Sequence, residues 1–524
     1  MVGGSSAINS FAMIYPNQAG IDIWGKVGNF GWSWPDLEPY FRRFQTLCEP
    51  DAGFDQKIPI VSPTDEALDG PIQASLPMRS TALHGAWVET FRNLGLENRH
   101  DPLKGQAIGG YISTCHISAD RRERSHAGNA YLNASTMDKE NLIIMTDALV
   151  QRVEFRAERE KSDLATATGV WYRRNGALHF VRASKEVILA AGALSSPAIL
   201  ERSGIGSPSL LARHGVKLVY ANGNVGENLQ DHIRAGLSFR AAPNVEPSEP
   251  EDPEEARRQY QRDRTGPWAE HGCWTFAHLP ILPFLSPREE DMLRQKIIKL
   301  LDASNSGSLS MFERQHIGYV RDMVLSRQEA TSTTFLSRQP ASAESRGGPH
   351  EYISLFSMLS HPLSRGHVHI TSCDASAPPE IDCKYYSHPL DLEIHARHLQ
   401  VLGRIAASLP LRNHVLPGGH VLPLEGDVET LEGAKHVCRK YARTNYHPCG
   451  SCAMMPENAG GVVTDQLRVY GTRNVRVIDS SIFPVIPRGN IVTTVYAVAE
   501  KAADIMSETW TTCDTQHGPM RRRI

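Results

Sequence analysis

The stretch that decides the fold runs from residue 444 to 501 and opens with Asn445-Tyr446-His447-Pro448-Cys449-Gly450-Ser451-Cys452. It continues through Val475-Arg476-Val477-Ile478-Asp479-Ser480, which predicts an apolar strand that ends in an acidic residue. It closes with Arg488-Gly489-Asn490 ahead of an alanine-rich segment, 493–506, that predicts a helix. An acidic strand end followed by small residues, beside a helix that begins after Gly-Asn, is typical of the edge of a cofactor site.

Two side chains of this stretch suit proton transfer. His447 and Asn490 lie in separate predicted loops, which a rigid scaffold can hold at one site. A neutral imidazole accepts a proton near pH 7, and an amide can orient the group that releases it. The pairing suggests oxidation of an alcohol. A structural, hydrogen-bonded role is the competing interpretation for His447, because the chain has 22 histidines.

The nine cysteines are scattered and odd in number, which does not indicate a disulfide framework. Cys449 and Cys452 form a Cys-x-x-Cys motif, so dithiol chemistry or half of a zinc site stays open as an interpretation. No second such motif completes a zinc site, and we expect no metal. The favoured interpretation is that small residues let the backbone pass close to a flat ligand.

The rest of the chain alternates strand and helix patterns. Ser33 and Pro35 predict the start of a helix, and Pro410 predicts the end of another over 391–409. Strands are predicted at 142–145, 149–153 and 169–172, and a strand buried on both faces at 186–192, with the next helix capped at Ser195-Ser196-Pro197. We interpret 121–124 as a solvated or carboxylate-paired surface patch, 241–270 as a surface insertion, and 511–524 as a polar tail.

Composition narrows the class of protein. At 524 residues, with 41% hydrophobic and 22% charged residues, the chain is typical of a globular protein of two domains. A net charge of −3 gives no reason to expect nucleic acid as a partner, and no apolar run is long enough for a transmembrane segment. No signal peptide is visible after Met1, so we expect a soluble protein and leave cytoplasm and secretion open.

Several stretches together resemble the glucose–methanol–choline (GMC) family of flavin oxidoreductases. Residues 2–9 resemble the first signature of that family, and 192–206 match the second signature at every defined position. Residues 225–232, Val-Gly-Glu-Asn-Leu-Gln-Asp-His, follow it as in relatives, and 444–506 resemble the catalytic C-terminus. The resemblance implies an α/β fold with a Rossmann-like FAD-binding domain and a substrate domain built on a mixed or antiparallel sheet flanked by helices.

The resemblance also implies roles for individual residues. His447 takes the position of the base that removes the substrate hydroxyl proton, Asn490 that of a His or Asn that hydrogen-bonds the same substrate oxygen, and Tyr446 that of an aromatic pocket residue. The remaining implied positions contact FAD: Gly4, Ser5, Asn9, Val150, Asp479, Ser480 and Ile491. Ile8 stands where some relatives carry a flavin-linking His, so we expect non-covalent FAD. The implied reaction passes a hydride from a small-molecule alcohol to the flavin, and then to O2 or another electron acceptor. The sequence does not predict which alcohol is oxidised, whether the protein is an oxidase or a dehydrogenase, or what its oligomeric state is.

The resemblance departs at the start of the sequence. Relatives begin with a strand, a Gly-x-Gly-x-x-Gly turn and a helix that hold the pyrophosphate, and we find no such unit ahead of Val2. We therefore expect unpaired neighbouring strands and an N-terminally incomplete FAD domain (1–50, 126–235 and 456–510) beside a substrate domain (51–125 and 236–455). One explanation is an ordinary flavoenzyme whose upstream part lies outside this sequence. The alternatives are a flavin-free binding or scaffold protein and a non-redox lyase.

Overall fold

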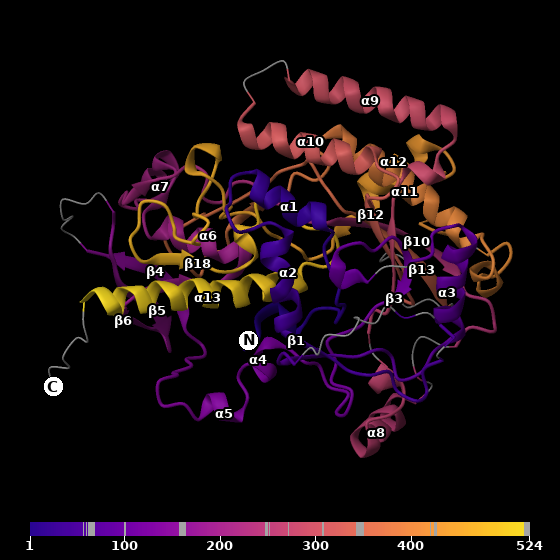
Figure 1. Ribbon diagram of the computed structural model, residues 1–524, viewed down its shortest axis with the longest axis horizontal. Helices are drawn as coiled ribbons and strands as arrows, with labels where there is room; N and C mark the ends of the chain where they lie inside the picture. Colours follow the sequence, from indigo (N-terminus) through magenta and orange to yellow (C-terminus); the bar gives the residue numbers. More distant parts are fainter. Residues whose placement is uncertain are drawn as a thin grey trace.

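The computed structural model describes residues 1–524 except 56, 59, 61–68, 99–100, 157–163, 247–249, 251, 271, 306–308, 342–350, 420, 424–426 and 518–524. The predicted α/β class is confirmed, with strands in separate groups and helices packed around them (Figure 1). Within the described residues no helix is both long and apolar enough to span a bilayer.

The largest sheet is antiparallel and has seven strands. Its order is β16-β10-β13-β12-β11-β3, and β17 also pairs with β10. The strands are β3 (Gly109–Ile112), β10 (Ile233–Arg240), β11 (Thr275–Leu279), β12 (Ser332–Ser337), β13 (Tyr352–Leu359), β16 (Val421–Leu422) and β17 (Arg443–Thr444). Helix α11 packs on β13 and β10, and α3 packs on β3. The helices on this side are α3 (Ala82–Asn93), α8 (Pro253–Asp263), α9 (Pro287–Asn305), α10 (Met311–Leu325), α11 (Pro389–Ala406) and α12 (Leu431–Tyr441).

A second group of shorter sheets lies on the other side of the molecule (Figure 1). Strands β4 (Leu149–Phe155), β5 (Ala167–Arg174) and β6 (Ala177–Arg182) form an antiparallel sheet, while β7 (Val187–Leu189) and β18 (Val475–Val477) pair in parallel. The other two-stranded pairs are β1 (Gln45–Leu47) with β2 (Ile72–Ala74), β8 (Ile205–Gly206) with β9 (Tyr220–Ala221), and β14 (His367–His369) with β15 (Glu380–Asp382). The accompanying helices are α1 (Gln18–Lys26), α2 (Trp34–Arg43), α4 (Ala127–Ala130), α5 (Ala134–Met137), α6 (Gly192–Arg202), α7 (Pro208–Arg213) and α13 (Val492–His517), with short 3₁₀ helices η1 (Gly4–Ala7) and η8 (Ser480–Ile482).

Local sequence signals place several helix ends correctly. Ser33 caps α2, because the Asp36 carboxylate accepts hydrogen bonds from the Ser33 backbone N–H (3.0 Å) and hydroxyl (2.5 Å). The predicted helix over 391–409 is α11, which begins two residues earlier and ends at Ala406. Helix α13 continues to His517, into the predicted polar tail at 511–524, and residues 518–524 lie outside the described residues.

The strand predicted at 142–145 is wrong, and the strand predicted at 186–192 is present as β7 but is not buried on both faces. Residues 142–145 form no strand and are exposed, with Ile143 at 82%. Strand β7 is covered on one face only, since Ile188 is 40% exposed, and within the described chain β7 pairs with β18 alone. An apolar run becomes a buried strand only where a partner strand and a covering layer are both present.

Helix α6 begins earlier than its proline predicts. It starts at Gly192, so Pro197 lies inside the helix rather than in its first turn. A proline has no N–H to donate to the carbonyl four residues back, which here belongs to Ala193. The Ser451 hydroxyl donates to that carbonyl instead, at 2.5 Å. The Ser451 hydroxyl thus replaces the hydrogen bond that Pro197 cannot form, and this contact connects the loop at 449–452 to α6.

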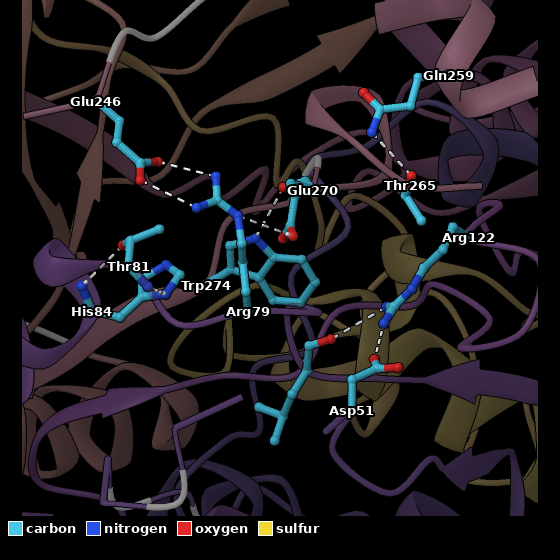
Figure 2. A network of polar contacts seen from close by, with 11 residues as sticks. Asp51, Arg79, Thr81, His84, Arg122, Glu246, Gln259, Thr265, Glu270 and Trp274 are labelled. Carbon is cyan, nitrogen blue, oxygen red and sulfur yellow. Dashed lines mark hydrogen bonds and ion pairs between the residues drawn. The ribbon is translucent and has the colours of Figure 1, made fainter. Parts of the chain in front are cut away.

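The carboxylate pairing expected for residues 121–124 is present at Arg122, but the surface position is wrong for this residue. Its side chain is buried and forms an ion pair with Asp51, while Tyr260 of α8 donates to the Arg122 carbonyl at 2.9 Å. Figure 2 shows this pair beside a second one, in which Arg79 donates to both oxygens of Glu246 at 3.1 Å. Arg79 also lies 3.7 Å from Glu270. These contacts attach the described part of the 241–270 insertion, including α8, to the body of the protein.

Candidate active site

The predicted base lies on a loop that is paired with a distant segment. Thr444 of β17 pairs with Ile233 of β10, and the backbones of Gln230 and Cys449 exchange two hydrogen bonds of 2.9 Å. Residues 230–234 and 443–449 thus form an antiparallel ladder across more than 200 positions of sequence. The ladder holds His447 at the end of the large sheet.

His447 is 7% exposed and is held at three points. Its backbone N–H donates to the Asp231 carboxylate at 2.8 Å, and its ring Nδ1 lies 3.0 Å from Nδ1 of His232. The two rings meet edge to face, at 82°. The other ring nitrogen, Nε2, lies 3.4 Å from the Asn445 side-chain amide nitrogen. Sequence reasoning gave no role to Asp231, His232 or Asn445. The signal available for the first two was the Asp-His pair that ends the stretch at 225–232.

Burial keeps the His447 imidazole neutral. It lowers the pKa of His447 well below its usual value, and His232 and Arg234 lower it further. Burial raises the pKa of Asp231, which accepts hydrogen bonds from Tyr385, Thr444 and the His447 backbone. The site therefore offers a neutral nitrogen base at pH 7, held by a carboxyl group at its backbone rather than at its ring.

His447 differs from other buried histidines of the chain. His232, His361 and His395 each direct Nε2 at a backbone carbonyl oxygen, at 3.2, 3.1 and 2.9 Å. A carbonyl oxygen only accepts, so these three Nε2 atoms carry hydrogen. Nε2 of His447 meets only the Asn445 amide nitrogen, a donor, among the residues that the structure describes. Nε2 of His447 therefore carries a lone pair, which accepts a long hydrogen bond from the Asn445 amide at 3.4 Å and which a substrate hydroxyl can take over.

The other two predicted site residues have less defined contacts. Tyr446 is 77% exposed and has a left-handed backbone, with φ of 60°. Asn490 is half-buried just before α13 and follows Gly489, whose φ is 83°. The described residues form no hydrogen bond between Asn490 and His447, and the predicted hydrogen bond of Asn490 to the substrate oxygen stays a prediction.

The predicted cofactor residues come from four separate segments. The Asp479 carboxylate accepts from the backbone N–H of Gly192 (2.9 Å), the Ser196 hydroxyl (2.5 Å) and the Ser481 N–H (2.8 Å), and Ser480 donates to the Pro448 carbonyl at 3.0 Å. Asp479 thus joins the end of β18 to the start of α6. Val150 lies in β4 and Ile491 precedes α13.

Two glycines leave the main chain accessible to a flat cofactor. Gly4 and Gly192 have positive φ values, and a Cβ built at either would meet nothing within 4 Å. Such positions let a planar ligand approach the main chain closely. The Asn9 side-chain oxygen, by contrast, already accepts from Arg124 at 2.8 Å and lies 2.7 Å from His116 Nε2, and Ser5 is exposed. The open backbone at Gly4 and Gly192 leaves room for a planar group, and the contacts of FAD with Gly4, Ser5 and Asn9 remain predictions.

The Cys-x-x-Cys motif has a structural role in the loop. Cys449 and Cys452 are buried free thiols, and the Cys452 N–H donates to the Ser481 carbonyl at 2.8 Å. No cluster of three or more metal-ligating side chains lies within the described ranges.

Comparison with known proteins matches two family models. GMC oxidoreductase models match residues 1–234 and 362–499. The GMC oxidoreductase family protein Mala s 12 of Malassezia sympodialis is 30% identical over 516 residues, which cover 97% of this chain and 79% of that protein. An oxygen-dependent choline dehydrogenase 1 of Chromohalobacter salexigens is 30% identical, over 96% of this chain and 80% of that protein.

Solved structures agree. An FAD-dependent oxidoreductase from Chaetomium thermophilum superposes with a TM-score of 0.83 at 26% identity, covering 98% of this chain and 86% of its own. A fungal aryl-alcohol oxidase gives a TM-score of 0.80 at 25% identity, with the same coverage. These matches define an FAD-dependent oxidoreductase. The chain belongs to the GMC oxidoreductase family, FAD is its cofactor, and its class of reaction is alcohol oxidation. No finding favours the flavin-free or lyase alternative.

Proposed function

We propose that this chain oxidises the CH–OH group of a small alcohol to a carbonyl, with His447 as the base. The observation that carries the proposal is the unprotonated Nε2 of a buried, neutral His447, whose one described partner is the Asn445 amide at 3.4 Å, whereas Nε2 of His232, His361 and His395 donates to a backbone carbonyl. A base of this kind near neutral pH contributes roughly 10²–10⁴-fold to the rate.

In the proposed step the substrate O–H bond breaks and its proton moves to His447 Nε2. FAD, when bound, supplies the acceptor for the hydride of the carbinol carbon. The electron pair of the O–H bond becomes the second bond of the carbonyl. Asn490 orients the same oxygen by donating from its amide, and the positive charge on His447 stabilises the negative charge that develops there.

The surroundings of the base extend the proposal. Tyr446, exposed beside His447, contributes to the substrate pocket. Non-covalent FAD contacts the backbone at Gly4, Ser5 and Asn9, and also Val150, Asp479, Ser480 and Ile491. A relative named choline dehydrogenase and a neighbour named aryl-alcohol oxidase support an alcohol as the substrate, with O2 or another electron acceptor completing the cycle.

The domain division is also a proposal. All strands of the large sheet except the start of β10 fall in 51–125 and 236–455, whereas β4 to β7 and β18 fall in 126–235 and 456–510. This segregation supports a substrate domain and an FAD domain with those bounds.

The test is flavin reduction by alcohols without oxygen in the FAD-loaded chain, followed by stopped-flow absorbance. His447→Gln is expected to slow reduction at least 100-fold while FAD stays bound. His436→Gln, at an exposed position of α12, is the matched control and is expected to reduce normally. Equal rates for wild type and His447→Gln would remove His447 from the chemistry.

A further inference from the structure

The contact between His232 and His447 has a definite direction. The two Nδ1 atoms are 3.0 Å apart, a hydrogen-bond distance, so one of them carries a hydrogen and the other accepts it. Heavy-atom positions alone do not say which. The second nitrogen of His232 decides it.

His232 Nε2 lies 3.2 Å from the carbonyl oxygen of Ser360, which only accepts. The hydrogen of a neutral His232 is therefore on Nε2, and its Nδ1 is a lone pair. The opposite direction would require either a doubly protonated His232 or two lone pairs facing each other at Ser360. His232 is fully buried, and burial lowers its pKa to about 4, which disfavours the doubly protonated form at neutral pH.

We propose that His232 is a positioning residue that holds His447 in the Nδ1–H form, so that Nε2 is the atom that receives the substrate proton. This inference rests on the proposed function of His447. In a neutral imidazole one nitrogen is protonated and the other is not, so an acceptor at Nδ1 leaves Nε2 as a lone pair. After proton transfer His447 carries hydrogen on both nitrogens, and its Nδ1–H still donates to the uncharged His232. The same contact thus stabilises the ring before and after the step.

The chain offers a matched control in His395. This residue is also fully buried, directs Nε2 at a carbonyl of the same strand region (Ser357, 2.9 Å), and has a partner at Nδ1 (Tyr386, 2.7 Å). Burial lowers its pKa to about 4, as for His232. His395 forms no described contact with His447, so it separates the general cost of losing a buried histidine from the specific effect on the base.

The experiment is ¹⁵N nuclear magnetic resonance of the full FAD-loaded chain with labelled histidine at neutral pH. His447→Gln identifies the His447 signals by their disappearance. The expected result is a protonated, pyrrole-type Nδ1 and an unprotonated, pyridine-type Nε2. A protonated Nε2 in the wild-type chain would overturn the proposal, and this measurement needs no variant at position 232.

Variants give a second readout. His232→Leu removes the acceptor at His447 Nδ1 and leaves the Asn445 amide as the described side-chain partner of the ring. It is expected to increase the fraction of His447 with hydrogen on Nε2 and to slow flavin reduction about tenfold or more, with alcohol affinity changed less than threefold. His232→Gln, whose amide can accept from His447 and donate to Ser360, is expected to restore most of the rate. His395→Leu is expected to leave both the His447 spectrum and the rate unchanged. An unchanged spectrum in His232→Leu, or equal effects at 232 and 395, would overturn the positioning role. If the wild-type spectrum is as expected but His447→Gln still reduces flavin, the proposed function fails, and only the statement that His232 sets the tautomer of His447 remains. If His447→Gln is inactive but Nε2 is protonated in the wild type, the proposed function stands and the positioning role fails.

Discussion

Arg476 of β18 provides a sharp test of what holds the cofactor side together. Its side chain is fully buried, and it donates to both carboxylate oxygens of Glu186, at 2.7 and 3.1 Å. It also donates to the Gln466 carbonyl at 2.6 Å and to the Thr509 hydroxyl at 3.2 Å. One guanidinium therefore links the residue before β7, strand β18 and helix α13.

Arg476→Met removes the cation and leaves the Glu186 carboxylate, 8% exposed, without its partner. Breaking a buried ion pair from one side costs about 3–5 kcal/mol, because the remaining charge stays buried. Removing both partners costs less, so Arg476→Met combined with Glu186→Leu is expected to recover part of the loss. Because β18 leads directly to Asp479, Arg476→Met is also expected to weaken retention of FAD.

The assay is urea unfolding followed by tryptophan fluorescence, with FAD retention measured after desalting. Arg43→Met is the matched control, since its side chain is 50% exposed beside Glu500 and Asp504, and it is expected to cost less than about 1 kcal/mol. A loss for Arg476→Met no larger than that for Arg43→Met would refute the reasoning.

Three further predictions concern the buried histidines, Gly489 and Asp231. Acid should destabilise the chain between about pH 6.5 and pH 4. Burial lowers the folded-state pKa of several histidines, so the unfolded chain binds more protons than the folded chain in this window. An unfolding midpoint that stays constant from pH 7 to pH 4.5 would contradict this. The histidines concerned, with pKa values of about 3 to 4, are His84, His116, His232, His361, His395 and His398. Gly489→Ala should cost about 1–3 kcal/mol in urea unfolding, because its φ is 83° and the new Cβ would lie 2.3 Å from Ile14, whereas Gly403→Ala, at an open position inside α11, should be neutral or stabilising. Asp231→Asn should slow flavin reduction without releasing FAD. The new amide has one oxygen that can accept from the His447 N–H, so it cannot keep all the hydrogen bonds that the two carboxylate oxygens accept, including the one from Tyr385. An unchanged rate would show that the loop needs no carboxylate at this position.

Local signals sufficed wherever a few neighbouring residues decide the structure. Ser33 and Asp36 determined the start of α2, Pro410 the end of α11, and the apolar run at 475–477 the strand β18. The loop position of His447 and the Gly-Asn before α13 were also predictable, because caps, breaks and apolar periodicity act within a turn or two.

The wrong predictions share one cause. The apolar run at 142–145 needs a partner strand, and none of the described residues pairs with it. Arg122 looks like a surface charge in a run of charges, but Asp51 lies beside it in the fold. Pro197 looks like a first-turn residue, but the Ser451 hydroxyl, far along the chain, accommodates it inside α6.

By itself, then, the sequence predicted several of the elements, the family and the identity of the candidate base. Only the tertiary structure decided which nitrogen of His447 is unprotonated, because that depends on His232, 215 positions away, and on the carbonyl that His232 faces. Hydrogen bonds between distant side chains leave no periodic trace in a sequence. They exist only once the large sheet has brought 230–234 and 443–449 together.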